Sequence, residues 1–525
     1  GANSVGSNYA SAHDGVYVAY GTSCLRLDPA TVEILSTFTL PGKPICSQIK
    51  IWDDLLIVAA DPRLFDPYKV GIRESWNATS SKKIAAVNRY NGAIVWQQTA
   101  DNAFHHNTII VGNDILFCID RLPPGYEARL SRRGITPGRA GAPYELLALN
   151  VRTGKEIWST AVDIFGTWLG YSEAHDILLQ SGRASRDMIP SEPTGRLITY
   201  RGRDGTPLWQ KTTGVENGPY LLHGDTLFMQ DVATGSALDL RTGARHMRTH
   251  PMTGESVPWR FLRAHGCNTA VGSQYLLTFR SGAAGYFDLR NNGGTGNLGG
   301  FRSGCTSNLF AANGVLNAPD YTRTCTCCYQ NQTSLALIHM PEAEMWTCGA
   351  AEAPNGPIKR VGINFGAPGD RLSDDGTLWL DYPSVGGPSP DIGVQTVPEK
   401  PEWFRRHSSR FAGDRMGWVT ASGAIGLTNL MIELGNSEDR AYRVRLHFAE
   451  PEGAGVGQRL FDVALQGKQV LKDFDIARHA GPDGAGVARE FRGIMVQNAL
   501  RLTLAPSLGS PINQPVICGI EVVAE

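Results

Sequence analysis

The sequence has no excess of charge of either sign and no long hydrophobic run. Its 49 Lys and Arg residues balance its 50 Asp and Glu residues, so no overall field would attract nucleic acid or an anionic membrane surface. No stretch of about 18 apolar residues, the length that crosses a bilayer as a helix, occurs. These absences argue against a nucleic-acid-binding protein and against a membrane span.

Several cofactor motifs are also absent. There is no Cys-x-x-Cys-His, which excludes covalent c-type haem, and neither a Gly-rich phosphate-binding signature nor His-Glu-x-x-His occurs. Long amphipathic helices are lacking, whereas 60 Gly and 30 Pro residues supply many turns between short strands. The composition therefore predicts an all-β protein.

Cysteine is sparse but clustered. Seven of the ten cysteines follow residue 260, and Cys305, Cys325, Cys327 and Cys328 lie within 24 positions. This usage favours an oxidising compartment and thus a secreted or periplasmic protein. A zinc site would usually need a second, separate cysteine pair. A disulfide, with Cys305 and Cys325 as the expected partners, is therefore favoured over a metal or redox role.

Two repeated signatures divide the first 350 residues. The first is a β-rich run, a small turn and a second apolar run, typical of a hairpin; the clearest copies are Thr108 to Cys118, Tyr220 to Met229 and Thr269 to Phe279. The second is an apolar strand, a turn with Gly and a strand that ends in Trp96, Trp158 or Trp209. We expect these Gly and Trp residues to serve turns and packing between units.

Two hairpins per period make a four-stranded unit, which is the blade of a β-propeller. We expect seven blades, beginning near residues 8, 45, 105, 166, 217, 266 and 306. An eighth blade is expected only if an upstream segment or a second subunit completes the propeller. The repeats stop near residue 350, which predicts a propeller over residues 1–350 and a second domain over residues 351–525.

The stretch from Asn150 to Trp158, Asn-Val-Arg-Thr-Gly-Lys-Glu-Ile-Trp, resembles the repeat of the quinoprotein (PQQ-like) propeller family. That family contains quinone-dependent dehydrogenases and non-enzymatic scaffolds such as the outer-membrane assembly lipoprotein, so the resemblance implies the fold and not an activity. The dehydrogenase branch implies PQQ, a nearby calcium ion and a disulfide between adjacent cysteines. Cys327 and Cys328 are adjacent, but no calcium-ligand set is evident.

Four stretches after residue 360 resemble malectin-type carbohydrate-binding domains. They begin at Ile363, Tyr442, Arg459 and Pro515, and Tyr442 to Phe448 alternates with period two, as a strand with one buried face does. The resemblance implies a β-sandwich of the jelly-roll type with a tendency to bind sugar. The alternative is a sandwich that only braces the propeller.

The repeat alignment also locates the mouth of the propeller channel, where small ligands usually bind. His105, His106, His265 and Arg302 lie just before the first apolar run of their blades, together with Asn8, Asn107, Asn268 and Asn308. Just after the second strand of a blade come Asp120, Arg121, Arg183, Arg280, Asp320 and Tyr321. One interpretation is structural: Asn and Asp bond loop backbone groups, and Arg side chains join blades.

The other interpretation is catalytic. Arg121, Arg183, Arg280 and Arg302 would neutralise a uronate carboxylate during β-elimination. A base would come from His105, His106 or His265, and an acid from Tyr321. A hydrolase would instead need two spaced carboxylates, for which Asp120 and Asp320 are the candidates.

The leading hypothesis is a secreted or periplasmic carbohydrate-recognising enzyme, a lyase or hydrolase of an anionic polysaccharide, that requires no cofactor or metal. The alternatives are an oxidoreductase that depends on a quinone or metal, and a non-catalytic scaffold or glycan-binding protein.

Overall fold

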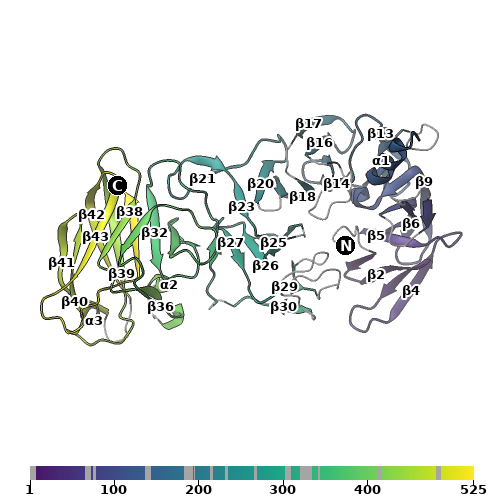
Figure 1. The fold of residues 1–525 in the computed structure, drawn as a ribbon. Coiled ribbons are helices and arrows are strands. Elements are labelled where there is room, and N and C mark those ends of the chain that lie inside the picture. The colour runs from purple at the N-terminus through teal and green to yellow at the C-terminus, as the bar shows by residue number, and fades with distance from the viewer. Residues whose placement is uncertain are drawn as a thin grey trace.

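The computed structural model describes the chain except residues 1–7, 66–71, 75–78, 136–142, 183–192, 194, 213–216, 231–233, 265, 267–268, 302–308, 320–333, 341–342, 411–415 and 481–485. The fold is all-β, as the composition predicts. Figure 1 shows the purple to teal strands β2 to β30 at one end of the molecule and the green to yellow strands β32 to β45 at the other. None of the helices in the described ranges is long and apolar enough to span a membrane.

The first part of the chain forms consecutive antiparallel sheets. The first sheet consists of β1 (Tyr9–Ala12), β2 (Gly15–Tyr20), β3 (Ser23–Leu27) and β4 (Ile34–Thr39). The next contains β5 (Cys46–Trp52), β6 (Leu55–Phe65), β7 (Ile72–Glu74), β8 (Ser80–Asn88), β9 (Ile94–His105), β10 (Ile110–Gly112), β11 (Ile115–Asp120), β12 (Glu145–Asn150) and β13 (Glu156–Thr160). One pairing, Asp120 with Phe104, joins two expected blades into this nine-stranded sheet.

Two four-stranded sheets, one five-stranded sheet and one three-stranded sheet follow. They contain β14 (Trp168–Ser172), β15 (Ile177–Ser181), β16 (Arg196–Arg201) and β17 (Pro207–Thr212); β18 (Asn217–His223), β19 (Thr226–Gln230), β20 (Thr234–Asp239) and β23 (Arg260–Leu262); β24 (Val271–Gly272), β25 (Leu276–Ser281), β26 (Ala283–Asp288), β27 (Thr295–Asn297) and β31 (Thr347–Cys348); and β28 (Phe310–Ala312), β29 (Val315–Ala318) and β30 (Leu335–Leu337). The hairpin of β21 (Met247–Thr249) and β22 (Ser256–Pro258) stands outside these sheets. The number of blades stays a prediction, because expected units merge in one place and the last sheet has three described strands.

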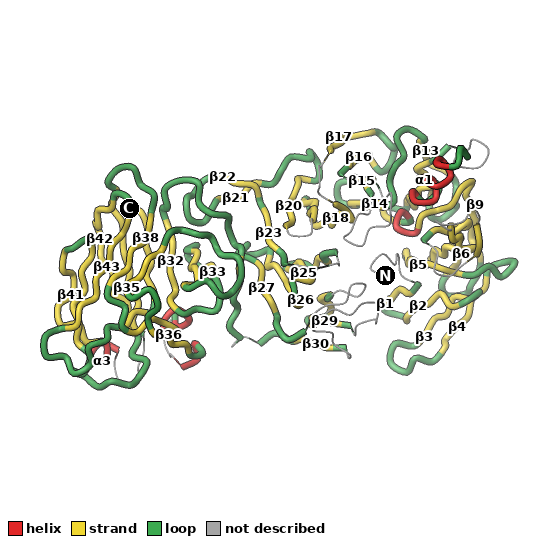
Figure 2. Tube along the Cα trace, in the orientation of Figure 1, coloured by secondary structure: helices red, strands yellow, loops and turns green. Residues whose placement is uncertain are grey.

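The second part is a sandwich of three sheets. They contain β33 (Arg371–Leu372), β34 (Leu378–Tyr382), β32 (Arg360–Phe365), β45 (Gly519–Ala524), β39 (Arg440–Phe448) and β42 (Val487–Val496); β35 (Val394–Val397), β38 (Asn429–Glu433), β43 (Ala499–Pro506), β40 (Leu460–Leu465) and β41 (Lys468–Asp475); and β36 (Glu402–Arg405), β37 (Ser422–Ile425) and β44 (Val516–Ile517). The helices are short, as Figure 2 shows in red: α1 (Pro124–Arg132), α2 (Gly417–Thr420), α3 (Ile476–Ala480), and the 3₁₀ turns η1 (His106–Thr108) and η2 (Ser408–Arg410).

The repeated Trp and Gly residues join each unit to the next. The Trp96 indole donates to the Val151 carbonyl at 2.7 Å. A Cβ atom on Gly154, whose φ is +67°, would lie 2.6 Å from the Trp96 ring. Trp158 repeats this contact with the Gly202 carbonyl at 2.7 Å. Trp209 donates in the same way to the Leu240 carbonyl at 3.0 Å. Glycine is needed at the turn both for its backbone conformation and for the space that the indole fills.

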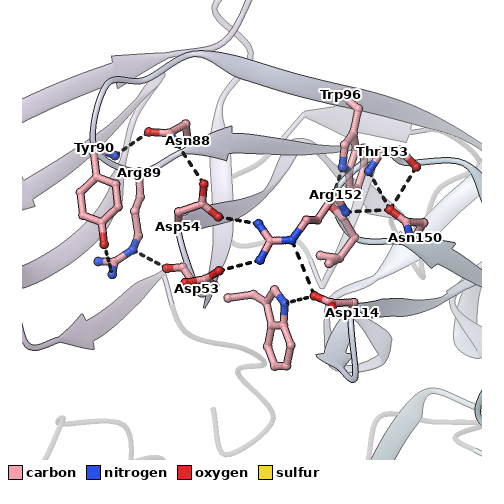
Figure 3. Close-up of polar contacts among 12 residues, drawn as sticks. Asp53, Asp54, Asn88, Arg89, Tyr90, Trp96, Asp114, Asn150, Arg152 and Thr153 are labelled. Carbon is pink, nitrogen blue, oxygen red and sulfur yellow. Dashed lines mark hydrogen bonds and ion pairs between the residues drawn. The ribbon is translucent and has the colours of Figure 1, made fainter.

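An arginine cluster fixes the same faces of two neighbouring units. Figure 3 shows Arg152, in the turn after β12, between the carboxylates of the β5–β6 turn and of the β10–β11 turn. Its guanidinium lies 2.5 Å from Asp53, 2.8 Å from Asp54 and 3.8 Å from Asp114. All four side chains are partly exposed, so each pair contributes little on its own. Together, the three pairs hold the β5–β6 turn of one unit next to the β10–β11 turn of the following unit.

One large hydrophobic core fills the sandwich, with two small clusters beside it around Cys518 and around Trp379. The predicted alternation in β39 is present from Tyr442 to Leu446 and ends at His447, which is buried like Leu446 and Phe448 on either side of it. Met252, in the β21–β22 turn, is also fully buried and belongs to this core, as do Ala350 and Ala351. The boundary predicted near residue 350 stays a prediction, and the sandwich core includes side chains from before it.

Candidate functional site

The two adjacent histidines of the predicted channel mouth lie together and are almost fully buried. His105 ends β9 and His106 begins η1, and they are 5% and 2% exposed. Burial, aided by the charges of Arg121 and His106, lowers the pKa of His105 to about 3, and burial also lowers the pKa of His106 to about 3. Both imidazoles are therefore neutral at pH 7, but groups with so low a pKa are weak general bases.

His106 is part of a hydroxyl network. Its Nε2 lies 2.8 Å from Oγ of Ser81 on β8 and 3.2 Å from Oγ of Ser47 on β5. The two hydroxyls are 2.8 Å apart, and Ser47 donates to the Ala59 carbonyl at 3.0 Å. This network joins three strands of one unit to the turn that leads into the next.

His105 faces a second serine. Ser80 on β8 is its partner in the β8–β9 register. Both side chains are buried, and within the described part of the chain neither the Ser80 hydroxyl nor His105 Nε2 makes a hydrogen bond. Buried polar atoms of this kind are uncommon and mark a place where a further polar group could bind.

Asp120 has the contacts that the structural interpretation expects. Its carboxylate accepts hydrogen bonds from the backbone N–H groups of Asp101, Asn102 and Ala103 at 2.5, 2.8 and 2.9 Å. Burial nevertheless raises its pKa. The carboxylate is thus committed to the backbone of β9.

Arg121 also joins neighbouring elements. Its guanidinium donates to the Leu122 carbonyl at 3.1 Å, to the Phe165 carbonyl, and to Glu127 at 2.7 Å, and lies 5.0 Å above the Tyr144 ring. The bond to Phe165 reaches the segment before β14 in the next sheet. A substrate carboxylate would have to displace these partners.

The remaining predicted site residues are spread or lie outside the described residues. Arg280 is 5% exposed on β25, where its Nε donates to the Gly282 carbonyl at 3.3 Å. Asn8 is exposed and donates to the Ala19 carbonyl at 3.4 Å, and Asn107 is half-buried in η1. Outside the described residues are Arg183, His265, Asn268, Arg302, Cys305, Asn308, Asp320, Tyr321 and Cys325. Their predicted roles stay predictions.

Among the described residues, no group of three or more His, Cys, Asp or Glu side chains is placed to hold a metal ion. Cys327 and Cys328 lie outside the described residues. The quinone-dependent alternative stays a prediction.

A groove where the β21–β22 turn meets the sandwich was not predicted from the sequence. Its volume is about 750 Å³, and it is lined by Thr249, His250, Pro251, Met252, Gly254, Lys359, Arg360, Leu372, Gly376, Arg440, Val523, Ala524 and Glu525. The backbone N–H groups of Lys359 and Arg360 both donate to the Met252 carbonyl, at 2.7 and 3.1 Å. These bonds fix the turn against the start of β32.

Basic side chains dominate the charge of this groove. The Glu525 carboxylate is directed to the Gly493 N–H at 2.9 Å, and Arg360 donates to the Asp375 carbonyl. No described residue forms an ion pair or side-chain hydrogen bond with Lys359 or Arg440. The groove thus presents cationic groups that an anionic ligand could bind.

His250 has a structural place beside the groove. Its Nδ1 accepts from the backbone N–H groups of Met252 and Thr253, each at 3.3 Å, so Nε2 carries the proton and donates to the Glu352 carbonyl at 3.1 Å. The imidazole therefore shapes the turn and leaves Lys359 and Arg440 as the groups available to a ligand.

Comparisons with known proteins assign the two kinds of structure. Residues 72–213 match the family of outer membrane protein assembly factor BamB, and residues 428–519 match the malectin domain family. The chain joins PQQ-like propeller repeats to a malectin domain. The two resemblances drawn from the repeats and from the strands after residue 360 are thereby confirmed.

Individual relatives share only part of the chain. A stretch of 76 residues is 38% identical to a probable LRR receptor-like serine/threonine-protein kinase of Arabidopsis thaliana, and covers 13% of this chain and 7% of that relative. BamB from Moraxella catarrhalis is 11% identical with a TM-score of 0.36, covering 59% of this chain and 81% of its own. The extracellular domain of ANXUR2 from Arabidopsis thaliana is 18% identical with a TM-score of 0.23, covering 32% and 41%. These similarities are low, so the PQQ-like propeller and the malectin domain are assigned from the family matches.

Proposed function

We propose that the protein binds an anionic carbohydrate, in a secreted or periplasmic setting, and that the groove beside the malectin domain is the binding site. The observation that carries this proposal is the pair of cationic side chains, Lys359 and Arg440, in a groove of about 750 Å³ with no protein anion bound to them among the described residues. A uronate or sulfate group would supply that anion, and the groove has the volume of a typical small-ligand site.

Binding to oligosaccharides tests this proposal. Uronate and sulfated oligosaccharides, and neutral ones of equal length, are titrated against the full chain by calorimetry. Lys359→Ala and Arg440→Ala should each weaken anionic binding about ten- to a hundredfold, because a hydrogen bond to a charged group contributes roughly 1.5–3 kcal/mol. Lys468→Ala, which removes an exposed lysine from β41 on the same domain, is the matched control. Equal binding of neutral and anionic sugars, or unchanged binding in both groove variants, would contradict the proposal.

Catalysis at the propeller mouth is a second candidate, supported by the adjacent His105 and His106 imidazoles and the unbonded Ser80 hydroxyl beside them. A lyase would release unsaturated product, seen by ultraviolet absorbance, and a hydrolase would release reducing ends. His105→Gln should abolish such activity while leaving binding in the groove intact. If neither product forms from a panel of uronate polysaccharides, the protein is a binding protein and not a lyase or hydrolase.

A further inference from the structure

Two cysteines from neighbouring sheets meet in one core. Cys24 lies on β3 and is 2% exposed, and Cys46 begins β5 and is 4% exposed. Both belong to a cluster of buried side chains between the first and second sheets that also contains Tyr17 and Phe38. The Cys46 N–H donates to the Gly21 carbonyl at 2.8 Å, which fixes the start of β5 beside the β2–β3 turn.

The two thiols are free and close enough to affect each other's ionisation. The Cys46 side chain, together with burial, raises the pKa of the Cys24 thiol, and the Cys24 side chain lowers the pKa of the Cys46 thiol, whose Sγ also lies 3.9 Å from the Pro44 carbonyl. The other described cysteines have different surroundings. Cys118 and Cys518 are buried in separate clusters, one inside the propeller and one inside the malectin domain.

We propose that Cys24 and Cys46 form a disulfide that ties the first propeller sheet to the second. A disulfide needs two sulfurs that can approach to bonding distance with little backbone movement. Cys24 and Cys46 are placed for this, because both are buried in one cluster and the backbone of Cys46 is bonded to Gly21, three residues from Cys24. The site is distinct from the cysteine cluster between residues 305 and 328, and it does not depend on the carbohydrate proposal.

The chemistry is thiol–disulfide exchange with a disulfide oxidant such as oxidised glutathione. The Cys46 thiolate attacks one oxidant sulfur, which breaks the oxidant's S–S bond and releases one reduced thiol. The Cys24 thiolate then attacks the Cys46 sulfur of the mixed disulfide, forms the Cys24–Cys46 bond and releases the second reduced thiol. The two cysteines lose two protons and two electrons, and the oxidant gains them. Because both sulfurs are buried in the folded protein, we expect the bond to form while the core is still open during folding.

The test is oxidative refolding of the full chain. The protein is unfolded, refolded in a buffer of reduced and oxidised glutathione, alkylated and digested without reduction, and its linked peptides are identified by mass spectrometry. We expect a peptide that links Cys24 to Cys46. We also expect the thermal midpoint of the refolded protein to be about 5 °C higher than after reduction, because a cross-link restricts the unfolded chain.

Variants separate this bond from other cysteine chemistry. Cys24→Ala and Cys46→Ala should lose the linked peptide and the part of the rise in thermal midpoint that the Cys24–Cys46 bond produces. Cys118→Ala, which changes a buried cysteine in a neighbouring core, should keep both. Peptide mapping of the unaltered chain decides the question even if a variant fails to fold. Alkylated Cys24 and Cys46 after refolding, or either one linked to a different cysteine, would overturn the proposal.

Discussion

In the malectin domain, one cluster of buried side chains runs through the facing sheets, from Val361 on β32 to Leu504 on β43. In the propeller, the buried side chains form several smaller clusters, most of which lie between neighbouring sheets, such as the one that contains Cys24 and Cys46. A single core makes a domain unfold as one unit, whereas a row of interfaces makes stability a sum of contacts between neighbours. The two parts of one chain should therefore respond differently to similar damage.

The largest effect is expected for Phe448→Ala in the malectin domain. Phe448 is fully buried and packs against Phe474 and Phe461, with ring centres 4.9 and 6.0 Å away. Its loss should cost about 3–5 kcal/mol of unfolding free energy. Hydrogen exchange should accelerate in every sheet of the domain.

Phe117→Ala is the matched change in the propeller. Phe117 is also fully buried and packs against Tyr171 of the next sheet at 4.8 Å. Exchange should accelerate in the two sheets that share this interface and not in distant ones. If Phe448→Ala had an equally local effect, the contrast between a single core and a row of interfaces would be wrong.

A smaller effect is expected at the joint between the two parts. Asp370 pairs through its backbone with Thr347 on β31 and accepts from Ser389 at 2.5 Å and from the Asp381 N–H at 3.1 Å. Burial, reinforced by the Asp381 carboxylate, raises the pKa of Asp370 to about 7 from 3.8. The folded state therefore binds more protons than the unfolded state between about pH 4 and 7, and stability falls as pH rises through that interval.

Asp370→Asn should remove this dependence. When the pH rises from 5 to 8, the unfolding free energy of the unaltered protein should fall by roughly 2–3 kcal/mol more than that of the variant. Urea unfolding at both pH values measures the difference, and Asp391→Asn, at an exposed carboxylate of the same domain, is the control. Parallel pH profiles for the unaltered chain and Asp370→Asn would show that the carboxyl is not responsible.

The smallest effect separates two roles of glycine in the propeller. Gly154 and Gly224 both have positive φ, +67° and +56°, but a Cβ atom would meet the Trp96 ring at Gly154 and nothing within 4 Å at Gly224. Gly224→Ala should cost about 1 kcal/mol from backbone strain, and Gly154→Ala about 1 kcal/mol more from overpacking. Equal losses in chemical unfolding would mean that the indole contact does not position the neighbouring unit.

The repeats were predictable because each unit must fit the same neighbour. The contact between Gly154 and Trp96 is repeated along the chain, because the Gly-containing turn of each unit packs against the Trp indole of the unit before it. The same signature, Thr253-Gly254 followed by a strand and Trp259, marks the β21–β22 hairpin. The repeat pattern predicts one such hairpin per period, and here a second one is inserted.

The candidate sites were less predictable. Alignment of the repeats could locate the types of residue at the propeller mouth. It could not show that Asp120 and Arg121 are buried and bonded to backbone groups, because these contacts depend on tertiary packing. The groove combines the β21–β22 turn with Lys359, Arg440 and the end of β45, which are far apart in sequence. Cys24 and Cys46 come together in one cluster only because two consecutive sheets stack, which their spacing in the sequence does not indicate.

Met252 has a consequence for how the protein can be divided. The side chain belongs to a propeller-side hairpin but fills the core of the malectin domain, together with Ala350 and Ala351. A truncation at residue 350 would leave one fragment with an exposed methionine and the other with a hole where it had been. The two parts should therefore be studied by point substitution in the intact chain. A separately expressed malectin domain would need another hydrophobic side chain to fill the space that Met252 occupies.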